Sequence, residues 1–258
     1  MPRGERASAG KRRVRRGARA KASVRDLDGT LSIAKFPEKG DRFDVVRWEA
    51  VMLTMARRAG ISVPQWRIEL VADTPVLILR RFDRERAARI PFLSAMSLLD
   101  AKDGETWSYV EFIDAVRRVA SHASTDGPQL WRRLAFNILA SNFDDHLRNH
   151  AVIFDGAGWR LSPAYDLNPV PRSEKERLLA TAINVDEDTT ASIELAIDAS
   201  TEFFLSRDAA CAIAGEVAKG IAAWRTNAAR IGIDAEEVHR MESAFEHSDA
   251  KRARAMTG

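Results

Sequence analysis

The sequence predicts an α+β fold with two lobes. The smaller N-terminal lobe is rich in β-strands and contains one helix, and the larger C-terminal lobe is mostly helical. Short apolar runs punctuated by turn residues extend to Arg81, whereas apolar residues recur at helical spacing from Phe92 onward. A chain of 258 residues suits one domain of two lobes better than two independent domains. We expect a basic tail over residues 1–16, the N-terminal lobe over 17–84 and the C-terminal lobe over 85–258.

Four strands are expected in the first lobe, over residues 22–25, 31–36, 65–70 and 76–81. The first two are joined at Asp28-Gly29, a pair that favours the tight turn of a hairpin. One helix is expected over residues 42–58, because Gly60 and Pro64 follow it at positions where helices end.

The second lobe is expected to contain five helices, over residues 110–121, 129–140, 193–197, 207–226 and 235–245. Its one late β signal is a hairpin over residues 151–161 with Asp155-Gly156 at its turn. The fourth helix shows the helical period most clearly, because Ile213, Val217 and Ile221 fall on one stripe.

A pattern D-x-H-x-x-N precedes the late hairpin. It places Asp144, His146 and Asn149 in one short segment, and Asp166 follows Asp144 by 22 positions, just after the hairpin. Enzymes that transfer the terminal phosphate of ATP use one carboxylate to orient the attacking hydroxyl, and an amide oxygen with a second carboxylate to hold Mg²⁺. The pattern therefore indicates a protein-kinase-like site, and the two lobes a kinase-like fold.

Within this pattern we expect Asp144 to orient the substrate hydroxyl and accept its proton. Asp145 is a rival for that role, but Asp144 stands five residues before Asn149, as the pattern requires. His146 is expected to support the site by bracing the backbone around the aspartate rather than to act as a base. Asn149 and Asp166 are the expected Mg²⁺ ligands, because Mg²⁺ prefers hard oxygen donors.

Lys35 ends an apolar strand and is the candidate for neutralising the phosphates of ATP. Glu49 lies on the apolar stripe of the first predicted helix, so its inward-facing carboxylate requires a cation as a partner. The simpler interpretation is that Lys35 is a surface lysine and Glu49 an ordinary glutamate of an amphipathic helix. The D-x-H-x-x-N pattern further along the chain favours the functional interpretation over this one.

Another metal chemistry is also compatible with part of the pattern. His146 and His150 are four residues apart and, on a helix, would lie on one side, as in zinc sites. With Asp144 and Asp166 they would form a hydrolytic metal centre. This interpretation leaves Lys35 and Glu49 without a role, so it is the less favoured one.

Several segments together resemble the HipA family of serine/threonine-kinase toxins from bacterial toxin–antitoxin systems. They follow the order of the family's blocks and cover residues 17–22, 33–37, 81–84, 90–94, 136–150 and 159–169. The resemblance implies ATP as cofactor and backbone groups near Arg80 and Phe82 that meet the adenine edge. It also implies a protein substrate, with aminoacyl-tRNA synthetases as family targets. A helix-turn-helix antitoxin would be the partner through which the toxin contacts DNA.

The chain departs from the family near Gly17, which matches a glycine of the phosphate-covering loop. Val14 stands where relatives carry a regulatory serine, and Arg16 where a second glycine is common. Residues 1–16 also leave no room for the additional N-terminal subdomain of the family. Three explanations compete: a frame-shifted or truncated copy of the gene, a start assigned too late, or a separate chain that supplies the subdomain. We therefore expect weak ATP binding by this chain, and a non-catalytic remnant that binds a nucleotide or a partner is the alternative to an active kinase.

Composition narrows the class of protein further. No apolar run approaches the length of a membrane span, and the basic N-terminus lacks the apolar core of a secretory signal. A single cysteine, Cys211, excludes an internal disulfide and a cysteine-based zinc cluster. We therefore expect a cytoplasmic protein. The first 21 residues carry nine Lys or Arg and one acid, Glu5. This basic segment is either a solvated tail or a contact for nucleic acid or phosphates.

Overall fold

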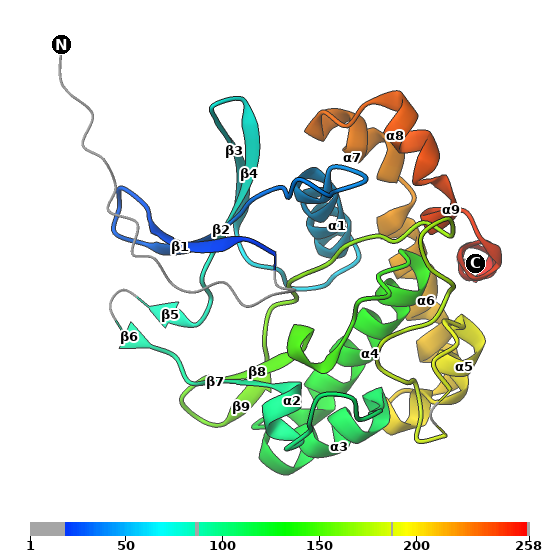
Figure 1. Cartoon of the computed structure of the whole chain (residues 1–258). Helices are drawn as coiled ribbons and strands as arrows, with labels where there is room; N and C mark the ends of the chain where they lie inside the picture. The colour runs from blue at the N-terminus through cyan, green and yellow to red at the C-terminus, as the bar shows by residue number, and fades with distance from the viewer. Residues whose placement is uncertain (1–18, 86–87, 187, 257–258) are drawn as a thin grey trace.

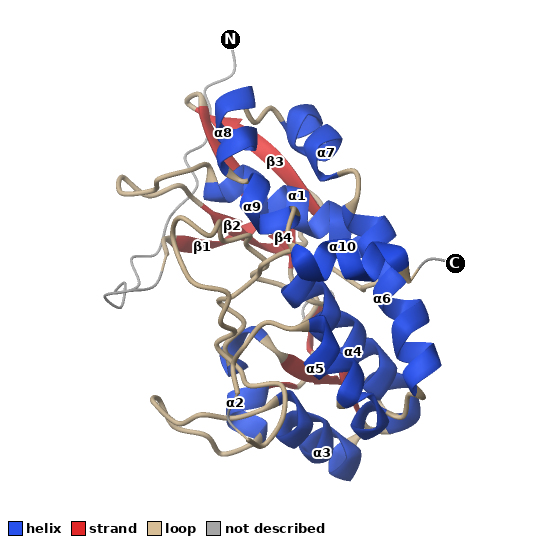
Figure 2. Ribbon diagram, turned by 90° about the vertical axis from the view of Figure 1, so that its right-hand side faces the viewer, coloured by secondary structure: helices blue, strands red, loops and turns tan. Residues whose placement is uncertain are grey.

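The computed structural model describes residues 19–85, 88–186 and 188–256. Within them the predicted α+β architecture is confirmed, with a four-stranded sheet and one helix first and a mostly helical region afterwards (Figures 1 and 2). Gly17 and the segment 1–16 lie outside the described residues, so the expectations for the phosphate-covering loop and the tail stay predictions.

The sheet of the first lobe is antiparallel and has the order β1-β2-β4-β3. Its strands are β1 (Lys21–Arg25), β2 (Leu31–Lys35), β3 (Trp66–Val71) and β4 (Thr74–Arg80). Gly29 has a φ of 84° in the β1–β2 turn, a conformation that a residue without a Cβ adopts at little cost. The register pairs Lys21 with Lys35, which places both side chains on the same face of the sheet.

Helix α1 (Val45–Arg58) follows β2 and is mostly buried, with Arg57 and Arg58 exposed at its C-terminal end. It starts three residues later than predicted, because the Asp44 side chain caps it by accepting a hydrogen bond from Arg47 N at 2.9 Å. Gly60, with a φ of 76°, follows its C-terminal end as predicted.

The second lobe contains the remaining elements. They are β5 (Arg84–Glu85), β6 (Ala88–Arg89), β7 (Phe92–Ser94), α2 (Ala95–Leu98), α3 (Tyr109–Val119), α4 (Ala123–Leu139), η1 (Leu147–Asn149), β8 (Ala151–Phe154), β9 (Trp159–Leu161), α5 (Ile193–Asp198), η2 (Ser200–Phe203), α6 (Arg207–Ile221), α7 (Trp224–Ile231), α8 (Ala235–Arg240), α9 (Glu242–Phe245) and α10 (Ser248–Ala255). The predicted late hairpin is confirmed as β8–β9, and Asp155 Oδ1 closes its turn by accepting from Ala157 N at 2.9 Å.

Four predictions for this lobe were wrong in detail, and one of them is the helix predicted over 235–245, which is two short helices, α8 and α9. Residues 92–94 form a strand that pairs with β8, which local sequence did not show because the partner lies about 60 residues away. The helix predicted over 207–226 is two helices, α6 and α7. Helix α4 starts at Ala123 rather than 129 and includes Gly127, where a Cβ would lie 2.8 Å from the Phe203 carbonyl oxygen. Gly127 therefore serves close packing against η2 and does not end the helix.

Helix α1 joins the two parts of the molecule. Its Trp48 ring lies 6.3 Å from the Trp224 ring of α7 and 6.0 Å from the Phe245 ring of α9. Glu237 of α8 accepts hydrogen bonds from Trp48 Nε1 at 2.8 Å and from Asp44 N at 2.9 Å. The hydrophobic core is therefore continuous from the sheet to the C-terminal helices, and it holds α1 in place from both sides.

No helix in the three described ranges has the length and apolar character needed to cross a membrane.

Candidate active site

Three side chains that are far apart in sequence meet between the sheet and the second lobe. Lys35 at the end of β2 pairs with Glu49 of α1 and with Asp166, which follows β9. Lys21 of β1 reaches the other oxygen of the same carboxylate, with its Nζ 3.0 Å from Asp166 Oδ2. The structure thus brings together Lys35, Glu49 and Asp166 as the sequence predicts and adds Lys21, which the sequence analysis did not single out.

Lys35 and Asp166 each stabilise the charged form of the other, whereas burial raises the pKa of Glu49. Burial lowers the pKa of Lys35, but the carboxylates of Glu49 and Asp166 outweigh burial and leave the pKa above its usual value. Burial would likewise raise the pKa of Asp166, but the ammonium groups of Lys35 and Lys21 lower it to about 2. Lys35 is therefore cationic and Asp166 anionic across the physiological pH range.

A cavity of about 260 Å³ opens beside this cluster. Its charged lining residues are Lys21, Lys35 and Asp166, together with Arg80, Arg81 and Asp83 at and after the end of β4. Apolar side chains from both lobes complete the lining, among them Ile33, Leu79, Phe82, Phe92 and Tyr165. The Phe82 and Tyr165 rings lie 5.7 Å apart. A planar, weakly polar ring fits against the apolar and aromatic side chains, and an anionic group fits beside the ammonium groups of Lys21 and Lys35, which matches the two halves of a nucleotide.

The segment that follows β4, where the adenine contact is expected, lines this cavity. The backbone N–H of Arg80 donates to Gln65 O at 2.8 Å, and that of Arg81 donates to Leu31 O at 3.0 Å. These two donors are used inside the sheet. Of the backbone groups expected to meet the adenine edge, only those of Phe82 therefore remain candidates. Arg80 still lines the cavity.

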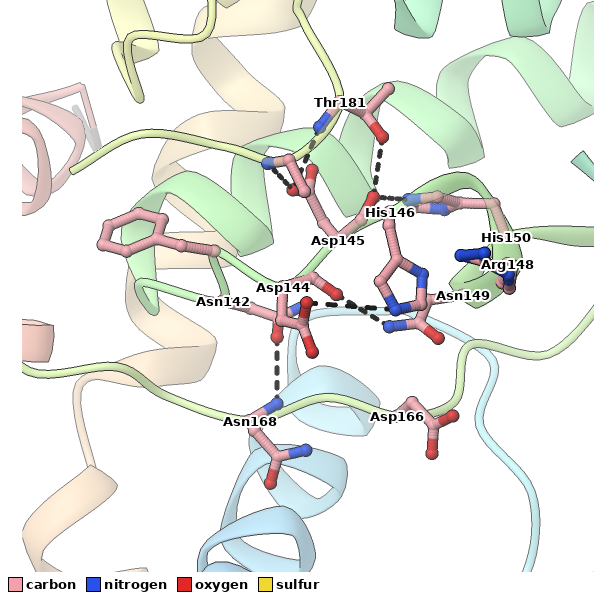
Figure 3. Close-up of polar contacts among 12 residues, drawn as sticks. Asn142, Asp144, Asp145, His146, Arg148, Asn149, His150, Asp166, Asn168 and Thr181 are labelled. Carbon is pink, nitrogen blue, oxygen red and sulfur yellow. Dashed lines mark hydrogen bonds and ion pairs between the residues drawn. The ribbon is translucent and has the colours of Figure 1, made fainter. Parts of the chain in front are cut away.

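The loop between α4 and β8 carries the D-x-H-x-x-N pattern (Figure 3). Its Asp144 side chain is 74% exposed and free for a hydroxyl-bearing substrate. Asn149 Nδ2 donates to the Asp144 carbonyl oxygen at 2.7 Å, so the amide oxygen of Asn149 stays available to a cation. The oxygens of Asn149 and Asp166 are the hard donors that Mg²⁺ requires, and Mg²⁺ usually completes its shell with phosphates and water.

Asp145 has a different environment from Asp144. It is fully buried and accepts hydrogen bonds from Tyr109 Oη at 2.7 Å and from Ala180 N at 2.6 Å. Thr181 Oγ1 donates to its carbonyl oxygen at 2.8 Å. Burial raises the pKa of Asp145 to about 6. This carboxylate ties the loop to the segment after Asp166 and is closed to a substrate, which supports Asp144 in the register favoured by the sequence.

The bracing of the loop expected from His146 is made instead by His150. His146 Nε2 lies 3.9 Å from Asp144 Oδ1, and its buried Nδ1 has no hydrogen-bond partner in the described part of the chain. His150 Nε2 lies 3.1 Å from the Asp145 carbonyl oxygen and can only donate there, because that oxygen is an acceptor. The i to i+5 spacing of Asp145 and His150 was the only sequence signal for this contact.

The zinc-like arrangement of His146 and His150 does not form. The residues between them adopt a 3₁₀ turn, and His150 Nε2 is engaged with Tyr109 and Asp145. Among residues 19–85, 88–186 and 188–256, no three or more His, Cys, Asp or Glu side chains converge as metal ligands. This absence does not argue against an Mg²⁺ site made of Asn149 and Asp166. Such a site has two protein ligands, and one of them is an asparagine amide rather than a His, Cys, Asp or Glu side chain.

His150 gives the fold a specific dependence on pH. Burial lowers its pKa to about 3, below the 6.5 of an exposed histidine, so the unfolded chain binds a proton more readily than the folded chain. Stability contributed by the neutral ring is therefore complete above pH 6.5 and is lost as the pH falls toward 3. Between pH 7 and pH 5 we expect His150 alone to lower the free energy of unfolding by about 2 kcal/mol.

Urea unfolding of wild type and His150→Gln at both pH values measures this, because glutamine keeps an N–H donor but does not titrate. The variant should lose less stability on acidification than wild type. The pKa of Asp145 is raised in the folded state, so this group adds stability as the pH falls. Both proteins contain Asp145, so its contribution cancels in the comparison. His239→Gln, at an exposed position, is the matched control. An identical loss in wild type and His150→Gln contradicts the prediction.

Comparison with known proteins places this geometry in a family. The family described as HipA-like C-terminal domain matches residues 15–225, which is most of the chain. The chain belongs to this family. Two relatives come from Sinorhizobium fredii: Putative kinase Y4mE is 26% identical over 179 residues, and Putative kinase Y4dM is 31% identical over 145 residues. These matches cover 58% and 50% of this HipA-like chain, but only 41% and 35% of the relatives.

Solved structures agree with the family. HipA of Shewanella oneidensis, determined in a complex with HipB and operator DNA, matches 96% of this chain and 65% of its own with a TM-score of 0.70 and 15% identity. The proinflammatory kinase CtkA of Helicobacter pylori matches 96% of this chain and 92% of its own with a TM-score of 0.66 and 13% identity. At such identities the likeness shows the fold, which is that of two-lobed kinases.

Proposed function

We propose that this HipA-like chain is an ATP-dependent serine/threonine protein kinase that requires Mg²⁺. The observation that carries the proposal is the cavity between the lobes. Lys35, which Glu49 pairs with, and Asp166 contribute charges to its lining, and the segment after β4 contributes the Phe82 ring. Membership of a family whose relatives are named as kinases supports the same reaction class.

In this mechanism the Lys35 ammonium group exchanges its contact with Asp166 for a contact with the phosphates of ATP. Its ion pair with Glu49 persists and keeps the lysine side chain in position. Lys21 enters the same space from the neighbouring strand. Both cations reduce the charge repulsion between the triphosphate and Asp166. The apolar side chains of the cavity hold the adenine ring, with the Phe82 backbone as the group closest to the expected hinge contact.

Asp144 orients the hydroxyl of a serine or threonine and accepts its proton as the oxygen attacks the γ-phosphorus. The new P–O bond forms as the bond to the β–γ bridging oxygen breaks, and ADP leaves. Asn149 and Asp166 would hold Mg²⁺, which supplies neutralisation of the phosphate charge when bound. The hydrogen bond from Asn149 Nδ2 to the Asp144 carbonyl ties the metal-binding amide to the loop of the base.

The biological setting follows from the relatives and belongs to this proposal. A toxin role is suggested by the HipA structure, which was determined with HipB and operator DNA. We therefore propose a helix-turn-helix antitoxin as partner, DNA contact through that antitoxin, and a protein substrate, for which an aminoacyl-tRNA synthetase is the first candidate to test.

The proposal is tested by incubating the protein with Mg²⁺, γ-labelled ATP and a bacterial extract, and by identifying phosphoserine and phosphothreonine sites by mass spectrometry. Wild type should label a small set of proteins, and Lys35→Met should not. Calorimetry with Mg-ATP runs beside it. A folded wild type that neither binds Mg-ATP nor labels any protein overturns the kinase proposal in favour of a non-catalytic module.

Lys21 should contribute to nucleotide binding less strongly than Lys35. Its side chain is 40% exposed, against 11% for Lys35, so solvent weakens its interaction with a phosphate. We expect Lys21→Met to raise the KM for ATP by roughly 5- to 20-fold, the scale of one hydrogen bond to a charged group. Steady-state kinetics with varied ATP measures this. Lys39→Met is the matched control, and equal KM values for the two variants would exclude Lys21 from the site.

A further inference from the structure

A groove lined by arginines runs around the end of the N-terminal sheet and adjoins the nucleotide cavity, with which it shares Arg80 and Arg81. It consists of two hollows of about 390 and 300 Å³ that share Asp28, Thr30 and Arg80. We call it the arginine groove, after the six arginines in its walls: Arg25, Arg57, Arg67, Arg80, Arg81 and Arg84. Its lining comes from β1, the β1–β2 turn, β3, β4, the C-terminal end of α1 and the start of β5. Figure 1 shows the β1–β2 turn and β5 on the same side of the molecule.

The groove has more positive than negative charge. Asp26 is engaged by Arg67, with Oδ1 2.6 Å from its Nη2, and Asp83 is shared by Arg81 and Arg84. The other three arginines have no carboxylate within ion-pair distance in the described part of the chain. Arg25 donates to the Gly29 carbonyl oxygen at 2.9 Å and Arg80 to Gln65 Oε1 at 3.3 Å, both neutral acceptors, and Arg57 is exposed. These guanidinium groups keep N–H donors for an external anion.

The chemistry of the lining favours phosphate groups. The cations of both hollows are all arginines, whose planar forks match the oxygens of a phosphate. Trp66 lines the larger hollow beside Arg67 and Arg80. An aromatic side chain among cations is the combination on which nucleic-acid bases stack while their phosphates are held.

The shape of the groove favours a flexible strand. Arg25 pairs with Leu31 and Arg80 with Ser32 in the sheet register, so these two arginines project from opposite faces of the sheet. Both nevertheless line the smaller hollow, which therefore passes around the sheet end. A duplex is stiff over about 150 base pairs, whereas a single strand bends over a few nucleotides.

From these observations we propose that the arginine groove binds single-stranded nucleic acid. Its phosphates contact Arg25, Arg57 and Arg80, and a base stacks on Trp66. Arg80 lines both this groove and the nucleotide cavity, whereas Arg25 and Arg57 line the groove alone, so these two are the residues to substitute in a test.

The test is fluorescence anisotropy with a labelled 12-nucleotide single strand, as RNA and as DNA, over a series of salt concentrations. The double variant Arg25→Gln/Arg57→Gln should bind at least 10-fold more weakly at low salt. Its plot of log affinity against log salt should be shallower by about 1.4, for two lost phosphate contacts at about 0.7 each. Phosphoryl transfer should be unchanged.

The control is Arg58→Gln/Arg118→Gln, which removes the same charge from exposed positions outside the groove. It should keep wild-type affinity and salt slope. The basic segment before residue 19 is present in every protein, so its contribution cancels. The proposal is overturned if both double variants lose the same affinity or neither does. Displacement of the strand by polyglutamate but not by unlabelled strand assigns the groove to an acidic polypeptide and overturns it as well, as does tighter binding of a 12-base-pair duplex.

Discussion

Replacing Asp166 with asparagine is expected to abolish the effect of Mg²⁺ on ATP binding. The substitution removes the charge of one proposed metal ligand and leaves its shape. Asparagine is also the better variant for the backbone, because Asp166 has a φ of 55°, a conformation that asparagine tolerates and alanine adopts at a cost of about 1 kcal/mol. In wild type, Mg²⁺ should tighten ATP binding by 10-fold or more, and in the variant it should have little effect.

The same variant should show the opposite change without metal. The Asp166 carboxylate engages both Lys21 and Lys35, and its neutralisation releases their ammonium groups for the triphosphate. We therefore expect Asp166→Asn to bind metal-free ATP more tightly than wild type. Calorimetry with ATP in EDTA and in Mg²⁺ measures both effects, with Asp166→Ala as a second variant and circular dichroism as a check of folding. An equal response to Mg²⁺ in wild type and variant rules out Asp166 as a metal ligand.

Replacing Asp144 with asparagine is expected to lower phosphoryl transfer by about 10²-fold or more, the contribution of a positioned acid or base. The KM for ATP should change little, because Asp144 is exposed on the loop and does not line the nucleotide cavity. Pre-steady-state measurement of phosphotransfer separates this loss from binding.

Asp145→Asn is the informative comparison, since it makes the same chemical change one residue away. Its carboxylate accepts from Tyr109 and from the Ala180 backbone in the interior, so the variant should lose about 1–3 kcal/mol of stability. Phosphotransfer per folded molecule should stay within several-fold of wild type. Loss of transfer in Asp145→Asn with an active Asp144→Asn would mean that the sequence register of the base is wrong.

Much of the candidate site could be predicted because its residues lie in short segments with their own signals. The D-x-H-x-x-N pattern, the hairpin turn at Asp155 and the amphipathic stripe that carries Glu49 are local features. An inward-facing glutamate needs a cation, and Lys35 supplies it in the structure. Lys21 was missed because it is an ordinary lysine in sequence, and only its register opposite Lys35 places it on Asp166.

Long-range packing decided the rest. His150 replaces His146 as the brace of the loop because a buried cluster with Tyr109 and Asp145 surrounds it. The strand over residues 92–94 exists because β8 offers it hydrogen bonds from a distant part of the chain. Gly127 lies inside a helix because η2 packs against it. In each case the partner lies too far away in sequence for a local pattern to reveal it.

The sequence by itself determined the α+β class, the order of strands and helices in the first lobe, the family and the segments that carry the site. These depend on periodicity, turn residues and motif spacing, which act over a few residues. Only the tertiary structure decided which face each side chain occupies, how Lys21 and Lys35 share Asp166, and that six arginines line one groove at the end of the sheet. Charges and hydrogen-bond partners interact through space, so their arrangement is fixed only when strands and helices from distant parts of the chain have packed together.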